Sequence, residues 1–199
     1  MEQIIHKYDI NTIAEAFVVS GLFGVFIGGV LSVIVWSILI NRRRRVSVGI
    51  RCLMLVVFSM SGLFTSLVLS ARNTAREIVD DVAMISIPKL RDLAYDNGID
   101  PDSVVPEKWE RLSKDFHQLL LSEGKSNLVF GVIIDFVFGY VEQLDVFASS
   151  IESVDTIVEF GRVSARRRVD SISSVSIVLI LSLPVCIFFV AFFWTRRIE

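Results

Sequence analysis

The sequence predicts an all-α integral membrane protein with three transmembrane helices, or four, and a helical extramembrane domain between the second and the last. Apolar residues make up 53% of the chain and are concentrated in blocks, whereas a soluble domain intersperses them with polar residues. Three blocks are long enough, at ~1.5 Å per helical residue, to cross a hydrocarbon core of ~30 Å. The intervening sequence shows no convincing strand pattern.

The first block, residues 13–40, follows an N-terminal segment of residues 1–12 and contains one charge, Glu15. A secretory signal peptide would have a shorter apolar region, a basic segment before it and a small-residue cleavage site after it. Here four arginines follow instead. The block therefore predicts a transmembrane helix.

An arginine turn, residues 41–45, leads directly into the second span, residues 46–70. So short a connection predicts an antiparallel pair of neighbouring helices. Arg51, near the start of the second span, can extend its side chain back to the interface. We interpret the turn as a cytoplasmic topology determinant, and the alternative is recruitment of anionic lipid headgroups. The basic residues of this turn are Arg42, Arg43, Arg44 and Arg45.

The third span, residues 172–194, precedes a short tail, residues 195–199. Pro184 lies in the middle of the span and is expected to kink it, which membrane helices tolerate. Trp194 and the two arginines of the tail are typical of a membrane–water interface, where aromatic rings and cations gather.

Residues 71–171 are predicted to form the helical extramembrane domain, of roughly 100 residues, well beyond the loop length to which positive-inside statistics apply. Its first part should continue the second span, and Pro88 is expected to end or kink that helix. Asn97 and Gly98 predict a helix stop. Pro106 suits the first position of a further helix, which should end at Gly124. That helix has the apolar face Trp109, Leu112, Phe116 and Leu119.

Residues 128–147 decide between three and four crossings. Their apolar core, Leu128–Val141, is short for a span and contains Asp135, which costs ~2.5–3.5 kcal/mol at a helix centre. A polar stripe that continues from Asp135 to Glu159 favours one long amphipathic helix outside the membrane. The distribution of arginines fits four crossings better. We favour three crossings, and with a fourth Asp135 becomes a candidate ion or proton site.

Small residues recur every four positions along the first span. They include a GxxxG pair and allow close approach of another helix, because lipid supplies no hydrophobic force for association. We favour packing against the second span, where Ser59, Gly62 and Ser66 form a plausible facing patch. Self-association and docking on another subunit are the alternatives. The helix-packing residues are Ala16, Ser20, Gly24, Gly28 and Ser32.

Few residues suggest cofactor or metal chemistry. The two cysteines, Cys52 and Cys186, lie in apolar blocks, and the only histidines are His6 and His117. A calcium loop from Asp96 to Glu107 would have Pro101 where an EF-hand requires glycine. Because no catalytic motif is recognised, we expect no catalytic residue, metal or cofactor. The net charge of −2 gives no argument for nucleic acid.

We therefore expect a non-enzymatic membrane protein that acts as an assembly, scaffold or sensory component through a helical extracytoplasmic domain and membrane helix packing. In general organisation alone it resembles the extracytoplasmic helical domains of bacterial membrane sensors. The alternatives are a channel or transporter subunit that uses Asp135, and an accessory subunit of a membrane enzyme. The expected partners are membrane lipids and either a second copy or another membrane protein. The expected location is multi-pass, in a bacterial inner membrane or a plasma membrane.

Overall fold

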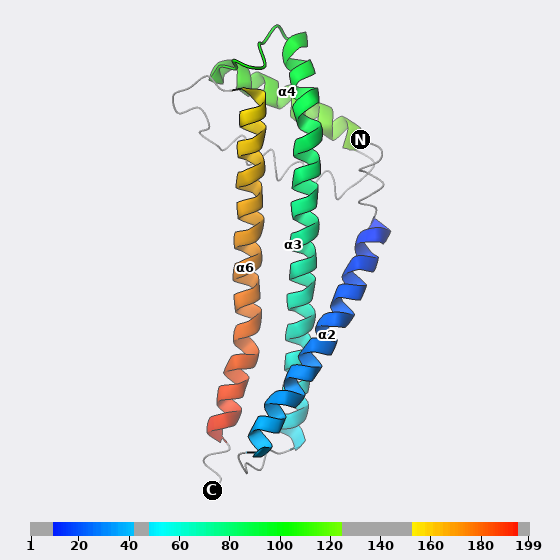
Figure 1. The fold of residues 1–199 in the computed structure, drawn as a ribbon, viewed down its shortest axis with the longest axis vertical. Helices are drawn as coiled ribbons and strands as arrows, with labels where there is room; N and C mark the ends of the chain where they lie inside the picture. Colours follow the sequence, from blue (N-terminus) through cyan, green and yellow to red (C-terminus); the bar gives the residue numbers. More distant parts are fainter. Residues whose placement is uncertain (1–9, 42–47, 125–152, 195–199) are drawn as a thin grey trace. The chain divides into compact units, whose positions relative to one another are not determined.

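The computed structural model describes residues 10–41, 48–124 and 153–194, which form four helices and no β-strand (Figure 1). The helices are α2 (Ile10–Asn41), α3 (Val48–Asp96), α4 (Pro106–Gly124) and α6 (Val154–Trp194). Within this described part, α2, α3 and α6 are long and apolar enough to cross a membrane. The predicted all-helical class with three helices of membrane length is confirmed.

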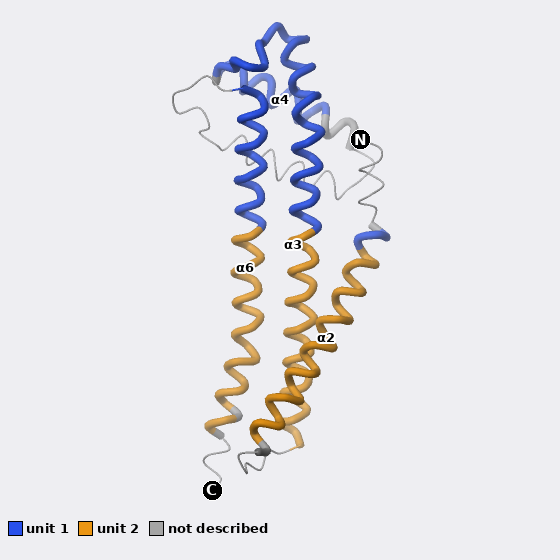
Figure 2. The backbone as a smooth tube through the Cα atoms, viewed as in Figure 1, with its two compact units in different colours: residues 1–13, 74–169 blue, residues 14–73, 170–199 orange. Residues whose placement is uncertain are grey.

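The chain divides into two compact units, coloured separately in Figure 2. Unit 1 comprises residues 1–13 and 74–169, and unit 2 comprises residues 14–73 and 170–199. Both α3 and α6 contribute to each unit, whereas α4 belongs to unit 1 and nearly all of α2 to unit 2. The two units differ in how their apolar side chains are buried.

Unit 2 exposes most of its large apolar side chains. Phe26 of α2, Val56 of α3 and Leu179 of α6 are 68%, 58% and 65% exposed. A water-soluble bundle would turn such side chains inward, whereas lipid solvates them. The small buried cluster of Leu39 and Met54 is packed by phenylalanine side chains of α3 and α6.

Unit 1 has a closed apolar core of the kind found in a globular domain. Its members come from three helices and from the connection between α3 and α4. Phe116, Val154 and Ile157 have no exposed surface. The buried core consists of Ile78, Val82, Leu90, Ala94, Ile99, Val104, Trp109, Leu112, Phe116, Val154 and Ile157.

Helix α3 continues through Pro88 and ends at Asp96, so Pro88 does not end it as one alternative predicted. Proline removes a single backbone hydrogen bond, and the core residues Val82 and Leu90 hold the chain on both sides. After Asp96 the chain turns out of the helix at Gly98, whose φ is 65°. The Ile99 N–H donates to the Ala94 carbonyl at 2.8 Å, which completes a glycine C-cap as predicted.

Helix α4 begins and ends at the predicted residues, and α6 begins at Val154. Ser153 caps α6, because the Thr156 N–H donates to its hydroxyl at 3.2 Å. The Val154 N–H donates instead to the Pro101 carbonyl at 2.8 Å. The amphipathic helix predicted along the stripe from Asp135 to Glu159 is therefore not continuous at Ser153. The hydroxyl of Ser153 and the Pro101 carbonyl accept from N–H groups that a continuing helix would pair internally.

Candidate functional site

The small residues predicted on the first span lie where α2 crosses α3 in unit 2. A Cβ atom added to Gly24 would overlap the Gly62 carbonyl oxygen and approach the Ser66 Cβ to 2.6 Å. A Cβ atom on Gly28 would overlap the Phe58 carbonyl and approach the Ser59 Cα to 2.8 Å. Backbone lies against backbone here, which only glycine permits.

Two serines link α2 and α3 beside this contact. The Ser20 hydroxyl lies 2.7 Å from the Ser66 hydroxyl and 3.0 Å from the Ser66 carbonyl oxygen. The Ser66 hydroxyl in turn contacts the Ser20 carbonyl oxygen. Such reciprocal bonds stabilise a helix pair in lipid, where water does not compete for the same groups.

The remaining predicted site residues are placed differently. Ser32 is 4% exposed, whereas Ala16 is exposed. Asp135 and the arginines of the turn, residues 42–45, lie outside the described residues. Arg51, close to that turn, has its guanidinium carbon 5.1 Å from the centre of the Trp36 ring, a cation–π contact.

In unit 1, Arg91 of α3 joins the start of α6 to the connection before α4. Its Nε and one terminal nitrogen donate to the two Asp155 carboxylate oxygens, both at 2.9 Å. The same terminal nitrogen donates to Asp102 at 3.1 Å. The hydrogen bond with Asp155 is the main cause that raises the pKa of Arg91. This bidentate geometry fixes direction as well as distance.

A second ion-pair network joins α3 to α6 further along both helices. Asp80 accepts from Arg162 at 3.2 Å and also pairs with Arg166. Arg162 donates two hydrogen bonds to Glu159, at 2.6 and 2.8 Å, and these lower the pKa of the Glu159 carboxyl. The side chains of Asp80 and Arg162 are 25% and 31% exposed, so their pair is less screened by solvent than a fully exposed one.

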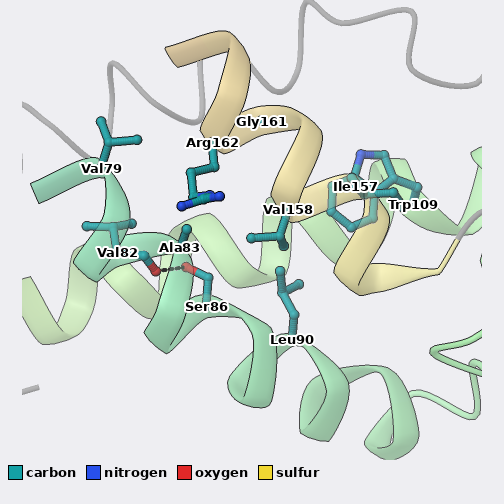
Figure 3. A pocket seen from close by; sticks show the side chains of 10 residues that line it. All are labelled: Val79, Val82, Ala83, Ser86, Leu90, Trp109, Ile157, Val158, Gly161 and Arg162. Atoms are coloured by element: carbon teal, nitrogen blue, oxygen red, sulfur yellow. Dashed lines mark hydrogen bonds between the residues drawn. The ribbon is translucent and has the colours of Figure 1, made fainter. Parts of the chain in front are cut away.

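Between these networks lies a small cavity of about 30 Å³, shown in Figure 3. Side chains of α3 and α6 face one another across it, Trp109 of α4 closes part of it, and the Arg162 side chain reaches in from α6. The Ser86 hydroxyl donates to the Val82 carbonyl at 2.6 Å, so its single donor is already used. A cavity of this size accommodates about two waters at most.

The candidate site is therefore an interhelical arrangement. Among the described residues, no group of three or more His, Cys, Asp or Glu side chains could hold a metal ion. The charged residues of unit 1 hold α3 and α6 in register, and the small residues of unit 2 hold α2 against α3. Both sets of contacts stabilise the packing of long helices against one another.

Sequence reasoning missed the ion pairs of unit 1. Asp80 and Arg166 are 86 positions apart, and Arg91 and Asp155 are 64 apart. No local spacing relates residues so distant. The sequence contains only a weaker signal at this place. Ser153 followed by Asp155 is typical of an N-cap followed by an acidic first turn, which indicates a helix start but not the partner of Asp155.

Comparisons with protein-family models, curated proteins and solved structures find no match to this chain.

Proposed function

We propose that this chain is a non-enzymatic integral membrane protein, in which unit 2 spans the bilayer and unit 1 is an extramembrane sensory or assembly domain. In this proposal the state of unit 1 is transmitted to the spans through α3 and α6. The observation that carries it is that each of these helices contributes to both units without a break. A continuous helix resists bending at the boundary, so a displacement at one end is felt at the other.

The core of unit 1 supports the proposal that this whole domain lies on one side of the membrane. Val154 and Ile157 of α6 pack in the same core as Leu112 and Phe116 of α4. A single membrane crossing between α4 and α6 would put these residues on opposite sides of the bilayer. The shared core, together with the Arg91–Asp155 pair, therefore supports three crossings and weakens the transport hypothesis based on Asp135.

The proposed partners are membrane lipids around unit 2 and either a second copy or another membrane protein. Most of the small-residue face of α2 is already occupied by α3, because Gly24 and Gly28 lie against its backbone. An assembly partner would therefore bind elsewhere in this helix arrangement.

Transmission can be tested with the two native cysteines, both exposed in unit 2. Asp80→Asn removes the charge that pairs with Arg162 and Arg166, and its matched control, Glu110→Gln, disrupts an exposed pair within α4. In liposomes, we expect Asp80→Asn to change the rate at which a lipid-soluble maleimide labels Cys52 and Cys186, and the control to leave it unchanged.

The result that would refute transmission is specific. Hydrogen exchange should first establish that Asp80→Asn loosens unit 1. If exchange in unit 1 rises while the labelling rates of Cys52 and Cys186 stay at the wild-type values, the two units are not coupled and the sensory proposal fails.

A further inference from the structure

The three consecutive arginines of α6, residues 166–168, do not share one role. Arg166 pairs with the Asp80 carboxylate of α3. Arg167 and Arg168 are exposed, because successive residues of an α-helix point about 100° apart around its axis. The structure thus divides one basic run into a cation that is used inside unit 1 and two cations on its surface.

Arg167 differs from the arginines near it in having no internal partner. Arg162 donates to Asp80 at 3.2 Å, whereas Arg167 forms no hydrogen bond or ion pair with the described part of the chain. The acid nearest to it in the sequence, Asp170, is bound by Arg72 at 2.8 Å, which balances the charge of that carboxylate. The charge of Arg167 is therefore available to an anion from outside the protein.

The two exposed arginines lie just before α6 enters unit 2. Unit 2 begins on this helix at Asp170, and its first large exposed apolar side chain is that of Ile172. At the helical rise, Arg167 precedes Ile172 by about 7.5 Å and Arg168 precedes it by about 6 Å. A bilayer of ~40–45 Å with a hydrocarbon core of ~30 Å has a headgroup layer of about 5–8 Å on each side. With unit 2 in the bilayer, both guanidinium groups are within reach of the lipid phosphates.

The chemistry of these side chains selects the charge of the lipid. A guanidinium group offers planar, paired donors that match the oxygens of a phosphate. Each arginine close to an anionic membrane surface strengthens the attraction about fivefold. A phosphatidylcholine headgroup carries a cation beside its phosphate and has no net charge, so the same arginines attract it much less.

We propose that Arg167 and Arg168 form a contact surface for the headgroups of anionic phospholipids. The lipid phosphate accepts hydrogen bonds from the two guanidinium groups, at the end of unit 2 that contains the Arg72–Asp170 pair. This contact ties α6 to the membrane surface at the point where it leaves unit 1. The inference rests on the proposed membrane location of unit 2.

The test places a fluorescent reporter beside the proposed surface. Ser171→Cys, at an exposed position one helical turn after Arg167, carries the reporter in a full chain with Cys52 and Cys186 replaced by serine. The chain is placed in phosphatidylcholine nanodiscs with a small fraction of nitroxide-labelled phosphatidylglycerol, or of phosphatidylcholine with the same label. The ratio of quenching by the two labelled lipids measures the local enrichment of the anionic headgroup.

The position of the reporter separates this surface from the arginine turn, residues 41–45. That turn precedes Val48, which lies about 36 Å along α3 from Arg72. The Arg72–Asp170 pair holds the start of the reporter's segment at the Arg72 end of unit 2. Lipids gathered by the arginine turn are therefore too far away to quench the reporter.

Two pairs of variants test the role of the charges. Arg167→Gln with Arg168→Gln removes both cations, whereas Arg167→Lys with Arg168→Lys keeps them. The matched control, Lys108→Gln with Arg111→Gln, removes the same net charge from exposed positions of α4, a helix that belongs wholly to unit 1.

We expect phosphatidylglycerol to be enriched at least fivefold over phosphatidylcholine at the reporter when both arginines are present. The enrichment should persist in the lysine pair and in the α4 control, and the glutamine pair should abolish it, with helix content unchanged throughout. Equal quenching by the two lipids, an enrichment that survives the glutamine pair, or an equal loss in the α4 control would overturn the proposal. Quenching by neither lipid would refute the membrane location of unit 2, and this inference with it.

Discussion

Substituting Gly24 by alanine should destabilise the α2–α3 pair by about 2 kcal/mol. The added Cβ would meet the Gly62 backbone and the Ser66 Cβ, and backbone atoms cannot rotate away. Overpacking of this kind costs ~1–3 kcal/mol. Separating the helices also weakens the Ser20–Ser66 bonds, worth ~0.6 kcal/mol each on average in membrane proteins. Alanine returns only ~0.5–1 kcal/mol through its helix propensity.

The matched control is Gly29→Ala, on the same helix but about 140° around its axis from Gly24. Its Cβ would meet only the Ser59 hydroxyl oxygen, at 3.8 Å, so the propensity gain should leave stability unchanged or slightly increased. The assay is the loss of helical circular dichroism in mixed micelles as the fraction of sodium dodecyl sulfate rises. Equal midpoints for Gly24→Ala and Gly29→Ala would refute the close crossing of α2 and α3.

Three further predictions concern unit 1. Phe116→Ala should cost ~3–5 kcal/mol, as for other buried phenylalanines, because Phe116 is fully buried in the core; chemical denaturation checks this against Phe160→Ala, which is 48% exposed and should cost less than ~0.5 kcal/mol. Arg91→Ala should speed hydrogen exchange in the first turns of α6, since it removes both bonds to Asp155; unchanged exchange there would contradict the described pairing. Arg162 lowers the pKa of Glu159 in the folded state below its ordinary value of 4.5. The ion pair therefore stabilises the folded state at pH values above 4.5, and this stabilisation is lost as the pH falls through the folded-state pKa. The melting temperature should therefore decrease as the pH is lowered below about 4.5, and the decrease should be smaller for Glu159→Gln.

Most helix boundaries followed from local sequence signals. Gly98 ends α3 and Pro106 opens α4 because each supplies a backbone conformation that the adjoining helix end requires. The apolar length of the three candidate spans was equally local, since it depends only on consecutive residues.

The rest could not be predicted, because it depends on contacts between distant residues. Gly24 predicts close approach to some helix, but its spacing does not name Gly62 as the partner. The sequence contains several arginines that could pair with Asp80. Only the packing of α3 against α6 places Arg162 and Arg166 beside it. The alternative in which Pro88 ends the helix is wrong, because core packing on both sides of Pro88 outweighs one lost backbone hydrogen bond.

The central claim is that unit 1 lies as one domain on one side of the membrane. The most direct measurement is labelling of intact cells with a membrane-impermeant thiol reagent, using single-cysteine variants at Asn97 and Thr156, which are both exposed, with Cys52 and Cys186 replaced by serine. If unit 1 is one domain on one side of the membrane, the two positions should behave alike, and with unit 1 outside the cell both should label in intact cells. Labelling of one position in intact cells, with the other reacting only after lysis, would place a membrane crossing between α4 and α6 and contradict the account.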